Sequence, residues 1–166
     1  NGSTPQLTDR FGNDARTLVW SDPVDVLMTT DLPEFYCVTS PNSANAEGSR
    51  INFSGSTSVS ANDLQIIAGF APAGQTGLFY YGPNQIQVPF GNGVRCVGGA
   101  VTRLNPPIVI SAPWGEAIHN LDNADPVHLA NIQAGTSWNF QFWYRDPADG
   151  GATFNLSDAV MIPFRP

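Results

Sequence analysis

The sequence predicts an all-β fold, an antiparallel β-sandwich of jelly-roll type with one disulfide, from three observations. Charged residues make up only 13% of the 166, whereas there are 16 Gly and 14 Pro, a composition typical of turn-rich β proteins. Short apolar runs recur between Pro, Gly, Asn and Ser residues, which indicates strands joined by turns. The segment Ser137–Arg145 alternates between aromatic and mostly polar residues, as a strand with one buried face does.

The order of elements follows from these runs. Residues 1–16 are polar and show no period, so we expect an N-terminal arm or edge segment there, followed by a single domain over residues 17–166. The predicted strands, in chain order, are Thr17–Trp20, Val24–Thr29, Glu34–Val38, Arg50–Phe53, Thr57–Ser60, Leu64–Phe70, Gly77–Tyr81, Gln85–Pro89, Val94–Leu104, Pro107–Ser111, Glu116–Leu121, Ser137–Arg145 and Ala159–Phe164. These strands are too many for one open sheet, and two packed sheets with a shared core accommodate them.

The phase of each strand predicts which side chains enter the core. The expected inward rows are Trp138, Phe140, Phe142 and Tyr144; Leu64, Ile66, Ala68 and Phe70; and Val160, Ile162 and Phe164. On the opposite face of Ser137–Arg145 we expect mostly solvent-facing side chains. Pro106 and Pro107 predict a break in the ladder or a sheet edge, and no segment shows a convincing helical repeat.

The charge balance excludes several classes of function. The chain has seven Arg, no Lys and 14 acidic residues, for a formal net charge of −7. We therefore expect no nucleic-acid partner, because nucleic-acid binding needs clustered cations. The missing Lys excludes Schiff-base catalysis and a phosphate-loop lysine. No apolar run approaches the roughly 18 residues of a membrane span, so we expect no membrane insertion.

Catalytic motifs are missing as well. His119 and His128 stand without metal-ligand spacing, and no Gly-x-Ser-x-Gly pentapeptide occurs. We therefore expect a protein that is not an enzyme, with no catalytic residues and no organic cofactor.

Two acidic clusters raise the alternative of a Ca²⁺ site. Candidate ligands are Asp122 and Asp125 in one cluster and Asp146 and Asp149 in the other, because hard cations prefer oxygen ligands. Neither cluster has the spacing of a calcium loop, and turns capped by Asp side chains explain the same residues.

Two cysteines, Cys37 and Cys96, each lie in an apolar stretch that we interpret as a strand. We expect a disulfide between them, with two buried free thiols as the alternative.

Aromatic residues outside the expected core suggest a binding face. Exposed aromatic rings beside hydrogen-bonding side chains form the flat platform that a glycan needs. The candidates are Trp143, Tyr80, Tyr81, Trp114, Asn139, Gln141 and Arg145. The alternative is that the same face packs on a neighbouring domain or another copy.

Two stretches also carry a family resemblance: GLFYYGPNQIQVPFGNGVRCVGG at 77–99, and TSWNFQFWYRD at 136–146 followed by FNLSD at 154–158. Together with Cys37 they resemble an uncharacterised β-rich domain found toward the C-terminal ends of secreted and cell-surface proteins of planctomycete-type bacteria. The resemblance implies an extracellular location and a pairing of Cys37 with Cys96, and it implies no known activity.

These observations lead to two expectations for function. The first is a non-catalytic extracellular module for adhesion or carbohydrate binding, whose partner is a glycan or another cell-surface component. The alternative is a self-assembling structural subunit of a filament or surface layer, in which residues 1–16 add to a sheet edge of the next copy.

Overall fold

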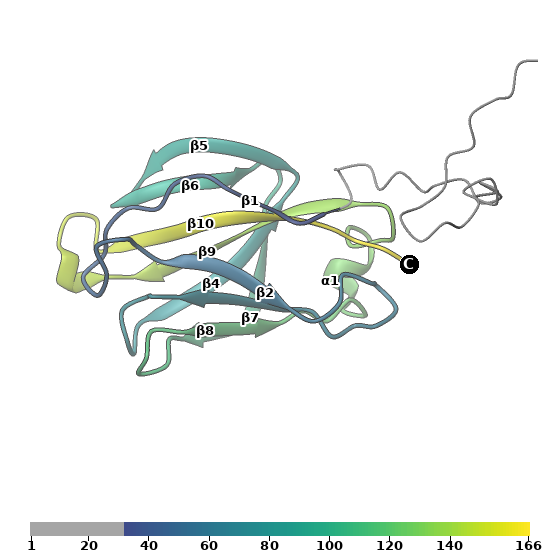
Figure 1. Cartoon of the computed structure of the whole chain (residues 1–166), viewed down its shortest axis with the longest axis horizontal. Helices are drawn as coiled ribbons and strands as arrows, with labels where there is room; N and C mark the ends of the chain where they lie inside the picture. Colours follow the sequence, from purple (N-terminus) through teal and green to yellow (C-terminus); the bar gives the residue numbers. More distant parts are fainter. Residues whose placement is uncertain (1–31) are drawn as a thin grey trace, which may run out of the picture.

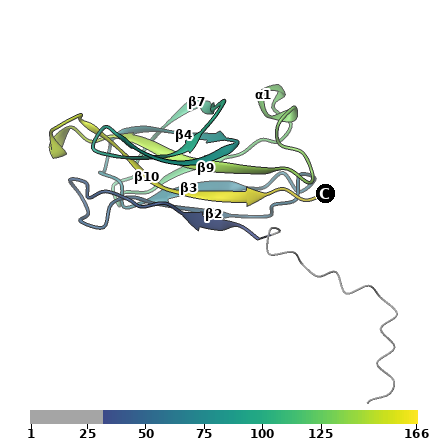
Figure 2. The same cartoon turned by 90° about the horizontal axis from the view of Figure 1, so that it is seen from above.

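The computed structural model describes residues 32–166, with the backbone alone at 105–110, and is built mainly of antiparallel strands (Figures 1 and 2). The strands are β1 (Glu34–Tyr36), β2 (Arg50–Ser54), β3 (Gln65–Gly69), β4 (Thr76–Gly82), β5 (Asn84–Phe90), β6 (Gly93–Gly98), β7 (Thr102–Ile110), β8 (Ala117–Asn120), β9 (Ser137–Arg145) and β10 (Phe154–Pro163). A one-turn helix, α1 (Pro126–Leu129), and a 3-10 turn, Pro147–Asp149, complete the described part. The predicted arm 1–16 and the predicted strands Thr17–Trp20 and Val24–Thr29 lie outside the described residues.

The strands form three sheets. A five-stranded central sheet has the order β1-β10-β9-β4-β7, a three-stranded sheet has the order β2-β3-β8, and β5 pairs with β6 in a hairpin. The pairings within these sheets are antiparallel. The predicted antiparallel β class is confirmed, and the jelly-roll topology stays a prediction.

One face of the central sheet packs against the three-stranded sheet and forms the main core. Phe79 and Tyr81 of β4 and Phe140 and Phe142 of β9 are fully buried there with Ile66 of β3. The predicted inward row of β9 is confirmed, with Trp138 packing at the margin of this core, because alternate side chains of a strand point to the same face.

The hairpin covers part of the other face of the central sheet. Cys96 and Val97 of β6 form a second buried cluster with Tyr80, Leu156 and Ala159. In Figure 1 the hairpin lies along one side of β10, away from β2 and β8. Both faces of the central sheet are therefore covered in this region.

The predicted disulfide is confirmed. Cys37, which follows β1, is bonded to Cys96 of β6 across a sequence separation of 59 residues. The neighbouring Tyr36 hydroxyl donates a hydrogen bond to the Cys96 carbonyl at 3.2 Å. The disulfide thus ties the hairpin to the β1 end of the chain.

The prediction that the second face of β9 is mostly solvated is wrong for Asn139 and Gln141, because the hairpin covers them. Gln141 is fully buried, and its Nε2 donates to the carbonyls of Val94 and Ser157. Its Oε1 accepts from the Cys96 amide and the Tyr80 hydroxyl. Asn139 is also buried and donates to the Gly82 carbonyl at 3.2 Å. The Gln141 amide thus uses both of its polar atoms in a buried cross-link, whereas Asn139 Oδ1 is buried without a hydrogen-bond partner.

Several predicted boundaries are also corrected. The segment 57–60 is not a strand and has only an isolated bridge at Ser58. The predicted strand Val94–Leu104 is two strands, β6 and β7, separated by a turn in which Gly99 has φ +79°. The prediction of a break in the ladder or a sheet edge at Pro106 and Pro107 is confirmed, because β7 is an edge strand of the central sheet and its pairing with β4 shifts register between Leu104 and Val109. Phe70 is 57% exposed rather than inward, because its φ of +62° ends the alternation of β3.

The one-turn helix α1 has a local cause. The Asp125 side chain accepts a hydrogen bond from the Val127 amide at 2.8 Å, and Pro126 occupies the first helical position, where a missing N–H costs nothing. No helix in the described residues 32–166 is long and apolar enough to span a bilayer.

Candidate ligand-binding site

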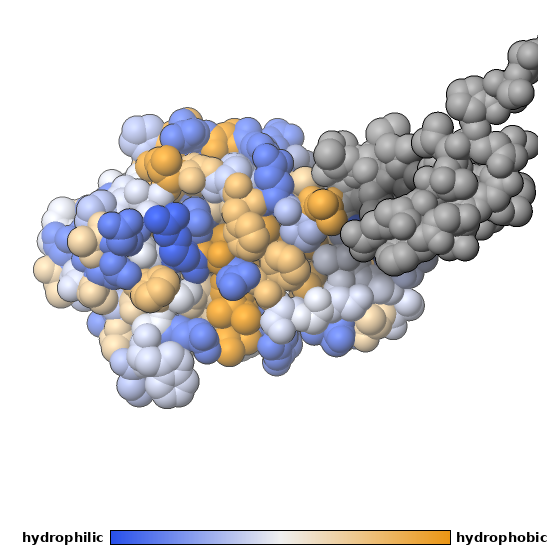
Figure 3. Space-filling model, viewed as in Figure 1, coloured by the Kyte–Doolittle hydropathy of each residue, from blue (hydrophilic) through white to orange (hydrophobic). Residues whose placement is uncertain are grey.

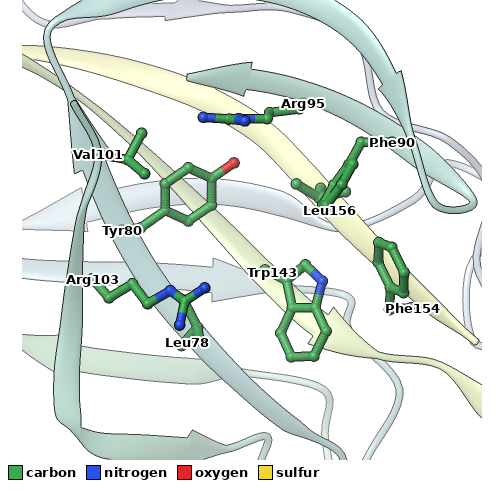
Figure 4. A pocket seen from close by; sticks show the side chains of 9 residues that line it. All are labelled: Leu78, Tyr80, Phe90, Arg95, Val101, Arg103, Trp143, Phe154 and Leu156. Atoms are coloured by element: carbon green, nitrogen blue, oxygen red, sulfur yellow. The ribbon is translucent and has the colours of Figure 1, made fainter. Parts of the chain in front are cut away.

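A pocket of about 450 Å³ opens between the hairpin and the outer face of the central sheet. Figure 4 shows its nine lining side chains, which come from β4, β5, β6, β7, β9, β10 and the β6–β7 connection: Leu78, Tyr80, Phe90, Arg95, Val101, Arg103, Trp143, Phe154 and Leu156. Its volume lies within the roughly 300–1,000 Å³ of small-molecule sites. Seven of the nine residues are aliphatic or aromatic, so the pocket is mainly apolar.

Strand alternation explains the floor of the pocket. Leu78 and Tyr80 lie two residues apart on β4, and Trp143 lies opposite Leu78 on β9. Their neighbours Phe79 and Phe142 point to the main core, so these three side chains must point to the hairpin side. The same alternation that builds the core therefore builds the pocket.

Aromatic rings form a continuous row along one wall. The ring centroids of Trp143 and Phe154 lie 5.6 Å apart, and those of Phe154 and Phe90 lie 5.2 Å apart. Trp143 and Phe154 are half-buried, and Phe90 is 46% exposed. Gly91 allows the hairpin turn to approach this row, because a Cβ there would collide with the Phe154 ring and its φ is +65°.

The polar groups of the pocket are Tyr80, Arg95 and Arg103. The Tyr80 hydroxyl donates to Gln141, and burial raises the pKa of Tyr80, with a smaller opposing effect from the Arg95 charge. Tyr80 therefore stays neutral at physiological pH. Arg95 Nε donates to the Val97 carbonyl at 2.9 Å, which fixes the direction of its guanidinium group. Arg103 is exposed.

The predicted binding face is not one surface. Tyr80 and Trp143 line the pocket, but Tyr81 is fully buried in the main core. Trp114 is 74% exposed and lies in the connection between β7 and β8, and Arg145 is exposed at the end of β9. Tyr80 and Tyr81 are consecutive in β4, so they cannot share a face.

Sequence reasoning missed seven lining residues. They are Leu78, Phe90, Arg95, Val101, Arg103, Phe154 and Leu156. The phase of Leu78 relative to Tyr80 was a usable signal. The other six depend on where the hairpin and β10 pack, which strand periodicity does not report.

The aspartates proposed as Ca²⁺ ligands shape turns and caps. Asp122 accepts from the Ala124 amide, Asp125 caps α1, Asp149 accepts from Asn92, and the buried Asp146 accepts from the Ser43 amide. Within residues 32–166, no three His, Cys, Asp or Glu side chains converge in a metal-binding arrangement. These contacts are those of turns and helix caps, and the Ca²⁺ site stays a prediction.

The two histidines lie away from the pocket. His128 Nδ1 is 3.1 Å from the Tyr81 hydroxyl, and the ring of His119 lies beside Phe79 in the core, 6.2 Å between centroids. Burial lowers the pKa of both imidazoles. Among the described residues, the pocket lining contains no His, Cys, Ser, Thr, Asp or Glu, and its side chains offer apolar contacts, aromatic ring faces and two positive charges.

In comparisons with known proteins, no protein-family model, no curated protein and no solved structure matches this chain. The resemblance to the planctomycete-type domain therefore stays an expectation, and the function is argued from the site alone.

Proposed function

We propose that this chain is a non-catalytic binding module of an extracellular protein, and that its pocket binds carbohydrate of a cell surface or polysaccharide. The observation that carries the proposal is the row of Trp143, Phe154 and Phe90 along the wall of an open pocket. Flat aromatic side chains offer large contact surfaces at low entropic cost. The C–H faces of sugar rings stack on such surfaces, while their hydroxyl groups stay in water at the rim.

Two further features support an extracellular binding role. The chain has a disulfide between Cys37 and Cys96, and disulfides form and persist mainly in oxidising compartments such as the cell exterior. The lining residues within 32–166 include no Ser, Thr, Cys, His, Asp or Glu to act as a nucleophile, and the Tyr80 phenol is held neutral by burial and donates to Gln141.

The test is a glycan array probed with the full chain and with Trp143→Ala. We expect binding that is lost in Trp143→Ala and retained in Trp114→Ala, the matched control, because Trp114 is a solvent-exposed Trp outside the pocket lining. If both variants bind glycan as well as the unmodified chain does, the sugar binds outside this pocket. No binding by the unmodified chain would refute the proposal.

Self-assembly is a second candidate function, favoured by two surface observations. Among the described strands β5 pairs with β6 alone, and most of its residues are exposed, so its outer edge is free to accept a strand from another chain. Figure 3 shows an apolar band across the face on which β1 and β2 lie. Phe35 of β1 also stacks on Phe53 of β2, with ring centroids 6.1 Å apart.

Light scattering over a concentration series separates the two candidates. A structural subunit grows into large particles, and the chain without residues 1–16 stays monomeric. A binding module stays monomeric in both forms.

A further inference from the structure

Two arginines give the pocket a positive charge that the other lining residues in the described part of the chain do not balance. We propose that the ligand of this pocket is an acidic saccharide, whose carboxylate or sulfate groups bind Arg95 and Arg103 while a ring face stacks on Trp143 and Phe154. This inference rests on the proposed function and names its ligand class.

The distribution of charge is the first argument. The chain carries a net charge of −7 and has only seven Arg and no Lys. Two of these seven cations line one pocket, and no Asp or Glu of the described part of the chain is in that lining. Concentrating scarce cations at one site in an acidic protein is a feature of anion recognition.

The lack of internal partners is the second argument. Arg50 shows how an arginine of this fold is neutralised, because it lies 3.6 Å from Asp158 and 3.8 Å from Glu47. Neither Arg95 nor Arg103 forms an ion pair with a carboxylate of residues 32–166. Both guanidinium groups are thus available to a bound anion.

The placement of the two groups is the third argument. Figure 4 shows Arg95 and Arg103 on opposite sides of the Tyr80 ring, at the edge of the apolar floor. Arg95 uses Nε to bind the Val97 carbonyl, which leaves its two terminal nitrogens as donors. A guanidinium group matches the two oxygens of a carboxylate or sulfate.

The ligand therefore has both an anionic group and a flat apolar face. A sugar acid or a sugar sulfate combines the two on one ring. A neutral saccharide leaves both guanidinium groups without a partner, so it should bind more weakly at this site.

The test titrates the full chain with three probes, followed by Trp fluorescence and calorimetry. They are an oligogalacturonate, which carries carboxylates, a heparin-derived oligosaccharide, which carries sulfates, and a neutral cello-oligosaccharide of equal length. We expect the affinity for at least one acidic probe to be about tenfold or more above the affinity for the neutral probe, because charge-assisted hydrogen bonds contribute that much. Comparing the two acidic probes identifies which anionic group the site prefers.

Two variants locate the effect. Arg103→Gln should lower the affinity for the acidic probe by about tenfold. Arg145→Gln removes the same charge from an exposed residue outside the pocket lining, and its affinity should match that of the unmodified chain. Since Arg103 is exposed, the melting temperature of Arg103→Gln should be unchanged, so a loss of binding is not a loss of fold.

Three results would overturn the inference. Equal weakening by Arg103→Gln and Arg145→Gln would mean attraction to overall charge rather than to this pocket. Equal affinity for the neutral and acidic probes, still lost in Trp143→Ala, would refute the acidic ligand and leave the carbohydrate-binding function standing. No binding of any saccharide to the unmodified chain would refute both.

Discussion

Replacing Gln141 with Leu tests how the hairpin that forms one side of the pocket is held on the central sheet. Gln141 lies in β9 at the interface with the hairpin, and its amide makes four hydrogen bonds. Two of them reach β6, at the Cys96 amide and the Val94 carbonyl. A third reaches the Ser157 carbonyl, which lies where the pairing of β10 with β9 shifts register between Leu156 and Ala159. The glutamine thus satisfies a carbonyl in this irregular stretch of the ladder and also anchors the hairpin.

The cost of Gln141→Leu follows from the groups it leaves without a partner. Three backbone groups lose a hydrogen bond, and each buried, unsatisfied group costs about 1–3 kcal/mol. The Tyr80 hydroxyl also loses its acceptor, but the pocket beside it admits water. Leu is of similar size and its burial offsets about 1.5–3 kcal/mol. With the middle value of about 2 kcal/mol for each of the three groups, the free energy of unfolding should fall by roughly 3–5 kcal/mol, a large part of the 5–15 kcal/mol typical of a domain.

Urea unfolding measured by far-ultraviolet circular dichroism gives the change directly. The matched control is Gln87→Leu, because Gln87 is an exposed residue of β5 and its replacement should change stability by less than about 0.5 kcal/mol. A loss below 1 kcal/mol for Gln141→Leu would contradict the reasoning. It would mean that packing and the disulfide hold the hairpin without the amide.

Two further predictions concern the disulfide and the buried histidines. Replacing Cys37 and Cys96 together with Ser opens a loop of 59 residues; in the chain-entropy model this lowers the free energy of unfolding by about 4 kcal/mol, and a melting temperature equal to that of the parent under oxidising conditions would contradict it. Burial lowers the pKa of His119 and His128 in the folded state, so the unfolded chain binds more protons below about pH 6.5. The free energy of unfolding, measured with urea, should therefore reach its full value at about pH 7 and decrease as the pH is lowered to 5. A double His119→Gln, His128→Gln variant should show a smaller slope over this window, and an unchanged slope would refute the assignment.

Much of the fold could be predicted because single strands carry their own pattern. Ser137–Arg145 was predicted with its observed bounds, since four aromatic residues at every second position leave one choice of inward face. Phe70 fits the same period and was misplaced, because a positive φ at the end of a strand leaves no trace in hydrophobic spacing.

The site was harder to predict because its parts are distant in the sequence. The pattern of β9 identified Trp143 as an outward aromatic side chain, but it gave the same status to Gln141, which is fully buried. The difference arises from the hairpin, which packs over Gln141 and leaves Trp143 half-buried at a pocket. Arg95 and Arg103 lie eight residues apart with the β6–β7 turn between them, and only the packed structure brings both to Tyr80.

The most direct test of the central claim, that this pocket is the binding site, is an NMR titration of the ¹⁵N-labelled chain with an oligogalacturonate. The indole N–H of Trp143 reports on the pocket, and that of Trp138 serves as an internal reference because it donates to the Asn131 carbonyl at 2.8 Å and is not part of the pocket lining. The account predicts saturable shifts of the Trp143 indole and of the Arg95 and Arg103 side-chain resonances, with the Trp138 indole unchanged. If other resonances shift while those of the Trp143 indole and both arginine side chains stay unchanged, the pocket is not the binding site.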